Sequence, residues 1–251
     1  MKKIIAALVV LAAIAGAVWY FVIDGDAPAE ANGVIDIAAM RALVANDAPE
    51  TLPSDVRIEF VGESQAPSFA VEAGAFEGQR ALSYNSFQLI TPAGDIIIDG
   101  AVDRATLEEM SQGKGSFSEE AYNHVLNAMT HAQRVLITHE HLDHVMAIAR
   151  HPAPDLVARR LQLTAPQLAA LPDHAPNGVL APSIARIGIA DFSTPQRIAP
   201  GVVAVAAPGH SEGTILIYAR TQAREYLFIG DIAWVMSSIE NARGRPRLIG
   251  L

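Results

Sequence analysis

Short apolar runs alternate with turn residues over most of the chain, and they predict a series of strands with helices between them. Runs rich in β-branched and apolar residues predict strands at 57–61, 86–90, 95–99, 133–138, 184–189, 202–206, 215–218 and 226–229. Pro92-Ala93-Gly94 predicts a hairpin turn between the second and third of these. Helical spacing predicts a helix at 118–129, capped by Ser118, and shorter helices at 35–44, 144–150 and within the proline-interrupted stretch 155–171.

The N-terminus carries a different pattern. Lys2 and Lys3 precede an unbroken apolar run from Ile4 to Ile23, which is long enough to cross a bilayer. We expect an uncleaved membrane anchor in residues 1–23. A signal peptide cleaved near Ala27-Pro28-Ala29 is the alternative. Lysines before the run and acids after it place the body outside the cytoplasm, in the periplasm, and 24–56 is predicted to be a linker with one short helix.

Composition narrows the partners of the chain. Of its 251 residues, 51% are hydrophobic, so a sizeable core is available. The net charge is −9 and only three lysines occur, which argues against a nucleic-acid-binding surface. The absence of cysteine agrees with an oxidising compartment. We therefore expect a small-molecule substrate rather than a nucleic acid, and contact with a membrane through residues 4–23.

The heptad Thr-His-Glu-His-Leu-Asp-His at 138–144 is the densest group of metal-binding side chains in the sequence. It follows a predicted strand. Side chains two apart on extended backbone point the same way, so His139 and His141 can bind one ion together. Asp143 and His144 are adjacent and diverge, so they can reach a second ion. Imidazole and carboxylate are the ligands of zinc sites that keep a position open for water.

H-x-H-x-D-H at the end of an apolar strand resembles the signature of the metallo-β-lactamase superfamily. Two further motifs follow in the order of that family, Pro208-Gly-His210-Ser-Glu-Gly-Thr214 and Phe228-Ile-Gly-Asp231. The resemblance covers residues 57–251. It implies an α+β fold, a four-layer αββα sandwich, with a dinuclear metal site. It also implies that His210 joins His139 and His141 on the first metal, and that Asp231 bridges both metals.

The chain lacks one ligand of the family pattern, and its residue types at two other ligand positions favour some branches of the family over others. No histidine follows His210, so we expect the functional protein to extend beyond Leu251 and to supply a histidine to the second metal. Without it, only Asp143, His144 and Asp231 hold that ion. His141 argues against the diiron flavoproteins, and Asp231 with the lack of cysteine argues against the antibiotic-degrading enzymes. The pattern is closer to the glyoxalase II, lactonase and nuclease branches, of which the acidic composition disfavours the nuclease branch. Asp99-Gly100 resembles the family's acidic turn, with a simple turn as the equal alternative.

The function that the resemblance implies is hydrolysis by a metal-activated water. We expect two zinc ions, with iron or manganese as alternatives, and an ester, lactone, thioester or related bond as the target. Asp143 or Asp231 is expected to orient the nucleophile or to shuttle its proton. Two alternatives remain: an oxidoreductase resembling the mononuclear-iron persulfide dioxygenases, and a non-catalytic anchored protein that keeps the fold.

Gly209-His-Ser-Glu-Gly213 also matches the G-x-S-x-G elbow of serine hydrolases. An elbow needs a helix after it and a histidine downstream, whereas here a predicted strand follows and the sequence holds no later histidine. Ser211 and Thr214 are therefore expected to fix the turn. The four remaining histidines, His124, His131, His151 and His174, are not predicted to be ligands.

Overall fold

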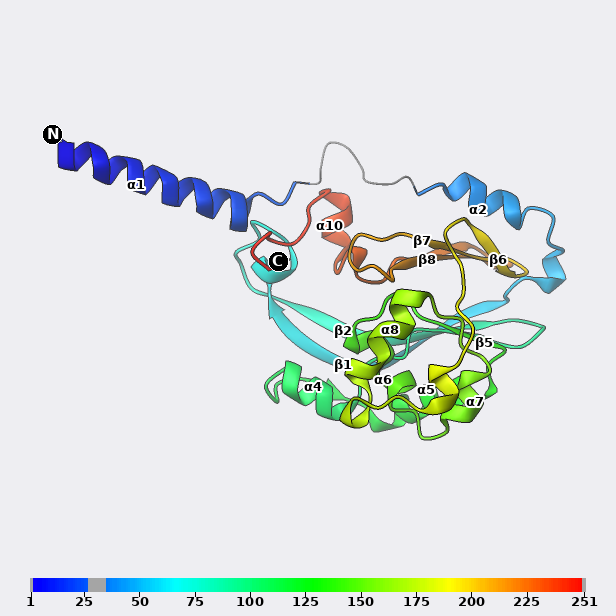
Figure 1. The fold of residues 1–251 in the computed structure, drawn as a ribbon. Helices are drawn as coiled ribbons and strands as arrows, with labels where there is room; N and C mark the ends of the chain where they lie inside the picture. Colours follow the sequence, from blue (N-terminus) through cyan, green and yellow to red (C-terminus); the bar gives the residue numbers. More distant parts are fainter. Residues whose placement is uncertain (1, 27–34, 250–251) are drawn as a thin grey trace. The chain divides into compact units, whose positions relative to one another are not determined.

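The structure of the chain is a computed structural model that describes residues 2–26 and 35–249 (Figure 1). The chain divides into two compact units. Unit 1 consists of Met1–Asn32, Gln65–Leu82 and Ala233–Leu251, and unit 2 consists of Gly33–Ser64 and Ser83–Ile232. The predicted cleavage motif at 27–29 and the chain end at Leu251 lie outside the described residues. The domain boundaries proposed from the sequence stay a prediction.

Unit 2 is built on two sheets. The first has the strand order β4-β1-β2-β3-β5 and the second β6-β7-β8-β9. β3 and β5 run parallel, and each of the pairs β1/β4, β2/β3, β6/β7, β7/β8 and β8/β9 runs antiparallel. The strand bounds are β1 Asp55–Pro67, β2 Gln79–Ile90, β3 Ile96–Ile98, β4 Ser116–Phe117, β5 Arg134–Leu136, β6 Gln196–Ala199, β7 Val202–Ala206, β8 Ile215–Arg220 and β9 Glu225–Phe228.

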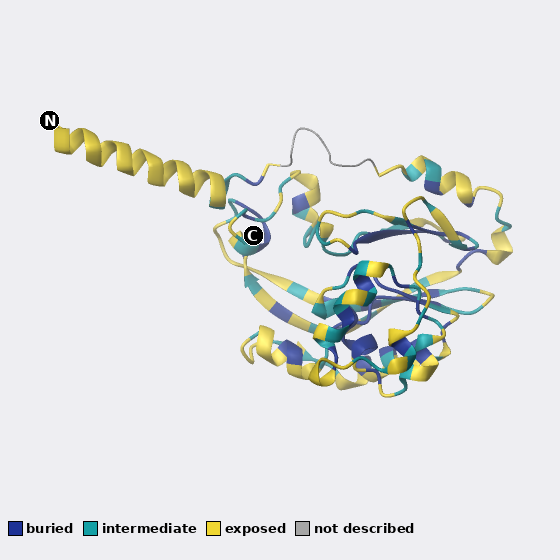
Figure 2. Cartoon of the chain, in the orientation of Figure 1, coloured by how far each residue is buried: buried dark blue, intermediate teal, exposed yellow. Residues whose placement is uncertain are grey.

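The central strands are apolar on both faces because both faces are buried. On β3, Ile96 and Ile98 belong to the core between the two sheets, whereas Ile97 belongs to the core under the helices. On β8, Ile217 faces the other sheet and Leu216 faces outward, and both are buried. Because successive side chains on a strand point to opposite faces, each of these strands contributes side chains to two separate cores. β3 and most of β8 are buried, and in Figure 2 buried segments lie on strands of the sheets and on helices beneath them.

Helices cover the outer faces of both sheets. α5 Glu119–His131, α6 Leu142–Ala149, α7 Pro154–Ala158, α8 Ala165–His174 and α9 Pro182–Ala185 share one core with the first sheet. α2 Ile37–Leu43 covers the second sheet, where Met40 packs with Val203 and Tyr218. Helix, sheet, sheet and helix follow one another in unit 2, which confirms the predicted αββα sandwich.

One local prediction differs from the structure. Residues 184–189 were predicted to be a strand, but Pro182 opens the short helix α9 and Ile184 packs in the helical core. Proline at the first helical position favours a helix, and a short apolar run suits either structure. The helix predicted near 35–44 is present as α2, and it packs on β7 and β8. The predicted hairpin turn is confirmed, with Gly94 at φ +114°.

Unit 1 contains the N-terminal helix, α1 Lys2–Val18, which continues as a π-helical turn, Trp19–Ile23. It also contains α3 Ser68–Val71 and α10 Met236–Glu240. Within the described residues, Lys2–Ile23 is the one helix long and apolar enough to cross a membrane, with a mean hydropathy of 2.5. A signal sequence near the N-terminus passes the same test of length and composition.

Asp103 caps α4 Arg104–Met110 and should contribute measurably to the stability of unit 2. One oxygen accepts from Thr106 N at 2.9 Å and the other from Arg150 Nη1 at 2.7 Å. Burial alone would raise the pKa of Asp103, but these partners outweigh burial and lower it. Asp103→Ala is expected to reduce the free energy of unfolding by about 1–2 kcal/mol, measured by urea denaturation in detergent.

The contribution of Asp103 should depend on pH. Because its pKa is lower in the folded chain, the stabilisation is complete above the unfolded value near 4 and is lost as pH falls through the folded value. Glu109→Ala, at an exposed position of the same helix, is the control and should change stability by less than about 0.5 kcal/mol. Equal effects of the two variants would contradict the assignment.

Candidate metal centre

Three loops at strand ends carry the predicted ligands, and the structure brings these loops together. His139 and His141 lie between β5 and α6. Asp143 and His144 lie in the first turn of α6. His210 lies between β7 and β8, and Asp231 lies in the 3₁₀ turn Gly230–Ile232 after β9. All six predicted ligands therefore come from the same end of the sandwich.

The six side chains form two clusters that share Asp231. In the first, the ligand atoms of His139, His141, His210 and Asp231 lie within 4.8 Å of one another. In the second, those of Asp143, His144 and Asp231 do so. Asp231 uses different oxygens: Oδ2 lies 3.8 Å from His139 Nε2, and Oδ1 lies 3.3 Å from His144 Nε2. A carboxylate placed in this way can bridge two ions.

The spacing of the donor atoms suits metal ions. Two ligands of one tetrahedral zinc ion, each about 2.1 Å from the metal, lie about 3.4 Å apart. In the first cluster, His210 Nε2 lies 3.0 Å from His141 Nδ1 and 3.6 Å from Asp231 Oδ2. In the second, His144 Nε2 lies 3.7 Å from Asp143 Oδ2. These distances surround the expected value.

His139 supplies an independent test of whether a metal fits here. Its side chain is completely buried, and its Nε2 has no hydrogen-bond partner among the described residues. Burial, followed by the nearby His144, lowers the pKa of His139 to about 2, so the imidazole is neutral at any working pH. A buried nitrogen without a partner is costly unless something binds it. A neutral imidazole nitrogen directed at a carboxylate is a ready ligand for a cation.

Asp99 orients His144 by contacting Nδ1, the ring nitrogen that does not face the second cluster. It is buried at a left-handed backbone position (φ +63°) in the loop after β3, and its Oδ2 lies 3.0 Å from His144 Nδ1. It also accepts from Thr138 N at 2.6 Å. Burial works to lower the pKa of His144, but the charge of Asp99 and the contact with Asp231 outweigh burial and raise it well above 6.5. Contacts of this kind set the orientation of ligand histidines in metal sites.

Gly230 allows Asp231 to approach the heptad. Its φ is +51°, which disfavours a side chain. A Cβ at this position would also lie 2.6 Å from Thr138 Oγ1 and 3.2 Å from His139 Nδ1. The Gly-Asp pair that the sequence analysis singled out is thus required by close contact between two loops.

Glu140 joins the heptad to the loop that carries His210. Its carboxylate accepts from Ser211 Oγ at 2.9 Å and from Gly213 N at 3.1 Å. On the other side of the same glycine, the buried Gln167 of α8 donates to Gly213 O at 2.7 Å and to Ile137 O at 3.1 Å. Gly213 is therefore held by two side chains, and a Cβ there would lie 2.3 Å from Glu140 Oε2. These contacts set the distance between His210 and the heptad.

Loss of the Glu140 contact should weaken the first cluster without removing a ligand. Glu140→Ala is expected to lower zinc affinity by about 10–100-fold, the range for residues that orient ligands. Isothermal titration with zinc measures the change. Glu212→Ala in the same loop is the control, because Glu212 is exposed and, within the described residues, forms no hydrogen bond with the heptad. An unchanged affinity in Glu140→Ala would show that the two loops hold their spacing without it.

Several residues of the site were missed or undervalued in the sequence. Glu140 and Gln167 act through tertiary contacts that no local pattern announces. Tyr84 of β2 is a buried phenol whose pKa is raised first by burial and further by the charges of Asp143 and Asp231. His174 is not in either cluster, but it hydrogen-bonds the Glu140 backbone, and its pKa is lowered mainly by burial.

The loop around Ser211 is a turn and not an elbow. It joins β7 to β8, and a strand follows it, so the serine-hydrolase alternative lacks its helix. Ser211 N donates to Thr214 Oγ1 at 3.0 Å, and the two hydroxyls lie 2.8 Å apart. The prediction that Ser211 and Thr214 fix this turn is confirmed.

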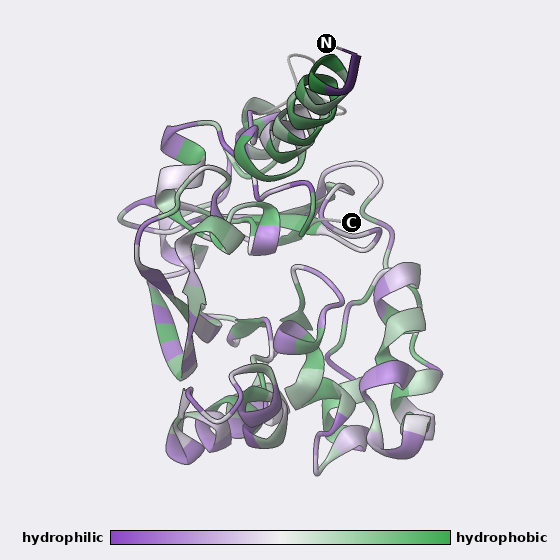
Figure 3. Cartoon of the chain, turned by 90° about the vertical axis from the view of Figure 1, so that its left-hand side faces the viewer, coloured by the Kyte–Doolittle hydropathy of each residue, from purple (hydrophilic) through white to green (hydrophobic). Residues whose placement is uncertain are grey.

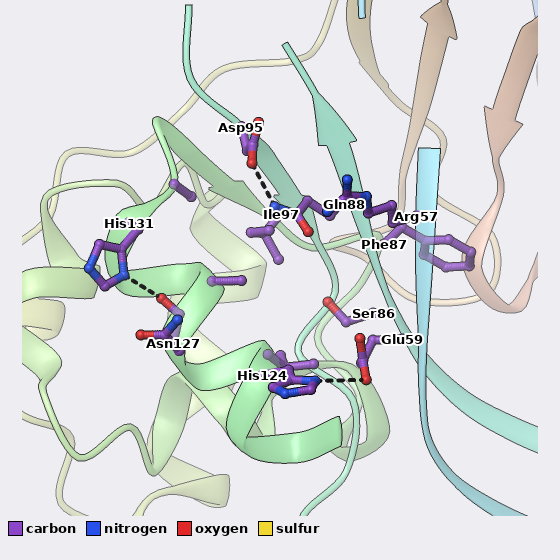
Figure 4. Close-up of a pocket in the computed structure, with 13 residues that line it drawn as sticks. Arg57, Glu59, Ser86, Phe87, Gln88, Asp95, Ile97, His124, Asn127 and His131 are labelled. Atoms are coloured by element: carbon purple, nitrogen blue, oxygen red, sulfur yellow. Dashed lines mark hydrogen bonds and ion pairs between the residues drawn. The ribbon is translucent and has the colours of Figure 1, made fainter. Parts of the chain in front are cut away.

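A pocket lies between α5 and the face of β1, β2 and β3 that α5 covers (Figure 4). It shares no residue with the two metal-ligand clusters. Its polar side chains pair with their own neighbours: His124 with Glu59 at 3.3 Å and Gln88 with Asp95 at 2.6 Å. His131 Nδ1 lies 2.9 Å from the Asn127 carbonyl. His124 and His131 are thus outside the metal centre, as predicted.

Comparisons with known proteins agree with the fold. A quorum-quenching N-acyl homoserine lactone lactonase has a TM-score of 0.58 at 17% identity, covering 81% of this chain and 84% of that chain. An N-acyl homoserine lactone hydrolase with its product at the catalytic metal centre has a TM-score of 0.57 at 17% identity, covering 79% and 85%. A probable metal-dependent hydrolase from Staphylococcus aureus has a TM-score of 0.52 at 16% identity, covering 78% and 82%. No family model and no curated protein sequence matches the chain.

Proposed function

We propose that this chain, whose fold is that of the metallo-β-lactamase superfamily, is a metal-dependent hydrolase acting on ester-type bonds. The observation that supports it most strongly is the pair of candidate ligand clusters that share Asp231; in the first, His139 Nε2 has no hydrogen-bond partner among the described residues. His139, His141, His210 and Asp231 would hold one ion, and Asp143, His144 and Asp231 the second. Zinc is the proposed metal because the donors are imidazole and carboxylate, with no cysteine in the chain.

Zinc ions at these positions would supply a hydroxide near neutral pH and polarise the substrate oxygen. The carboxylates Asp231 and Asp143 differ in pKa and are proposed to have different roles. Burial raises the pKa of Asp231, but hydrogen bonding and charge from His144 outweigh burial and hold the pKa well below its usual range. Asp231 is therefore anionic, and in this state it would bridge the two ions. Burial, with the charge of Asp231, raises the pKa of Asp143, so Asp143 is the carboxylate better able to hold a proton during turnover.

The substrate is proposed to be a small molecule with an ester, lactone, thioester or related bond. The two lactone-cleaving neighbours share the fold at low identity, and the site of this chain is open on one side, where His141 is exposed. The test joins metal analysis to activity. The purified full chain should contain two zinc ions and hydrolyse a lactone or thioester, and removing metal with a chelator should abolish turnover.

Other results of the same experiment distinguish the alternatives. A single iron with oxygen-dependent oxidation of a persulfide would support the iron oxidoreductase. Folded protein that binds no metal when zinc is supplied would support a non-catalytic role. Either result would overturn the hydrolase proposal.

The catalytic body is proposed to lie outside the cytoplasm, in the cell envelope. The support is the charged start followed by the apolar helix Lys2–Ile23. Cell fractionation tests the location, and intact protein in the soluble cytoplasmic fraction would contradict it.

A further inference from the structure

The segment that follows the apolar N-terminal helix is built into unit 1. Gly25 is buried, and its carbonyl accepts from Gly244 N at 2.7 Å. The carbonyl of Gly244 in turn accepts from Ala73 N at 3.0 Å. Asp26 forms an antiparallel bridge with Arg243. A Cβ at Gly25 would lie 2.3 Å from the Ala73 Cβ, so the packing here leaves no room for a larger residue.

Two arginines from the C-terminal part of the chain hold the end of the apolar helix. Arg247 Nη1 donates to Tyr20 O at 2.7 Å and to Asp24 O at 2.8 Å, and its guanidinium lies 4.3 Å from the centre of the Tyr20 ring. Arg243 Nη2 donates to Ile23 O at 2.8 Å. The last carbonyls of a helix have no partner within the helix and favour a nearby cation. The two arginines supply both the hydrogen-bond donors and the positive charge at this helix end.

The helix itself is exposed along its length. Every residue from Lys2 to Phe21 is exposed, and in Figure 3 most of the helix carries the hydrophobic colour, with a hydrophilic N-terminal end. Its 22 residues span about 33 Å, which matches the hydrocarbon thickness of a bilayer. Trp19 and Tyr20 stand at the end next to the body, and lysines stand at the other end. Aromatic residues favour the membrane–water interface, so the occupant that fits this surface is a lipid bilayer.

We propose that residues 20–26 are a permanent structural part of unit 1, so that the apolar helix is kept as a lipid-embedded anchor and is not removed as a leader. Cleavage at the Ala-Pro-Ala sequence 27–29 would remove Gly25 together with the carbonyls that Arg243 and Arg247 bind. Unit 1 would then lose a packed segment, and two arginines would lose their acceptors. The inference concerns unit 1 alone and does not depend on the proposed hydrolase activity.

The first test is the mass of the mature protein. The full chain with a C-terminal tag is expressed in bacterial cells, and its membranes are washed with alkaline carbonate. We expect protein of full-length mass in the washed pellet. A mature chain that begins at or after residue 27 would overturn the proposal. Full-length protein released by carbonate would overturn the lipid contact, because a helix held only by protein contacts is extracted.

The second test asks whether the contacts of residues 20–26 keep the rest of the chain bound to the helix after the chain is cut between them. A protease site is introduced between residues 29 and 30 and cut in isolated membranes. The tagged body should stay in the pellet after the cut, and its immediate release would contradict the proposal. Gly25→Ala should cause release after the same cut. Gly16→Ala is the matched control, because a Cβ at Gly16 meets no atom within 4 Å, and its body should stay bound.

A third variant guards against misfolding of Gly25→Ala. Arg247→Gln removes the charge that contacts Tyr20 and Asp24 without adding bulk. It should also release the cut body. Retention of the cut body in both variants would show that other contacts bind it to the membrane, and would overturn the structural role of residues 20–26.

Discussion

Replacing His139 by alanine is expected to lower the affinity for the first zinc ion by more than about 100-fold, because even residues that only orient ligands contribute 10–100-fold. His139 is the most buried of the candidate ligands, and its Nε2 has no hydrogen-bond partner among the described residues. Turnover should fall with the metal content. Zinc titration and elemental analysis of the purified variant measure the first effect, and a lactone or thioester assay measures the second.

His124→Ala is the matched control for this prediction. His124 is an exposed histidine that pairs with Glu59, outside both ligand clusters. Its replacement should leave zinc content and turnover within experimental error. If His139→Ala retained full metal and full turnover, the first cluster would not be the metal site. If both variants lost metal equally, the effect would reflect general destabilisation.

The candidate ligands could be predicted from the sequence because their signals are local. Four of them lie in a single heptad, and a strand before it places them at a strand end. His210 and Asp231 were found through motifs whose order resembles that of a known superfamily. Gly230 shows why such a motif contains a glycine: both its φ of +51° and its closeness to Thr138 exclude a side chain. A close contact that requires a particular residue type, such as glycine, can therefore be predicted from a local sequence motif.

Residues that act only through tertiary contacts could not be predicted in the same way. Glu140 lies inside the heptad and was assigned no role from the sequence, yet it accepts hydrogen bonds from Ser211 and Gly213, more than seventy positions later. Gln167 lies on a short proline-interrupted helix that had no assigned role. Their functions depend on which loops the sandwich brings together, and a single sequence does not contain that information.

The same distinction applies to the fold: secondary structure set by local sequence was predicted, whereas packing between distant segments was not. Strands β7, β8 and β9 follow their apolar runs closely, because a continuous apolar run suits a strand buried on both faces. The run 184–189 was misassigned because apolar residues alone do not separate a strand from a short helix. For α2, the helix was predicted, but its packing on Val203 and Tyr218 joins parts of the chain far apart in sequence.

The last prediction concerns the two ions separately. The first cluster offers three imidazoles and a shared carboxylate, whereas the second offers one imidazole and two carboxylates. Imidazole is the better ligand for zinc, so a zinc titration of this chain should show one tight site and one weaker site. Asp143 belongs only to the second cluster, whereas Asp231 belongs to both. Substitution by asparagine, which keeps the size and removes the charge, can therefore separate the two sites.

Asp143→Asn is expected to abolish the weak site and to leave the affinity of the tight site within about threefold, because its ligands are untouched. Asp231→Asn should abolish the weak site and also weaken the tight site by at least about tenfold, because the bridging charge is lost from both ions. Turnover should fall in both variants if hydrolysis needs two ions. Two equally tight sites in the unsubstituted chain would show that a further ligand completes the second cluster. Equal effects of the two substitutions on the tight site would show that Asp231 does not bridge.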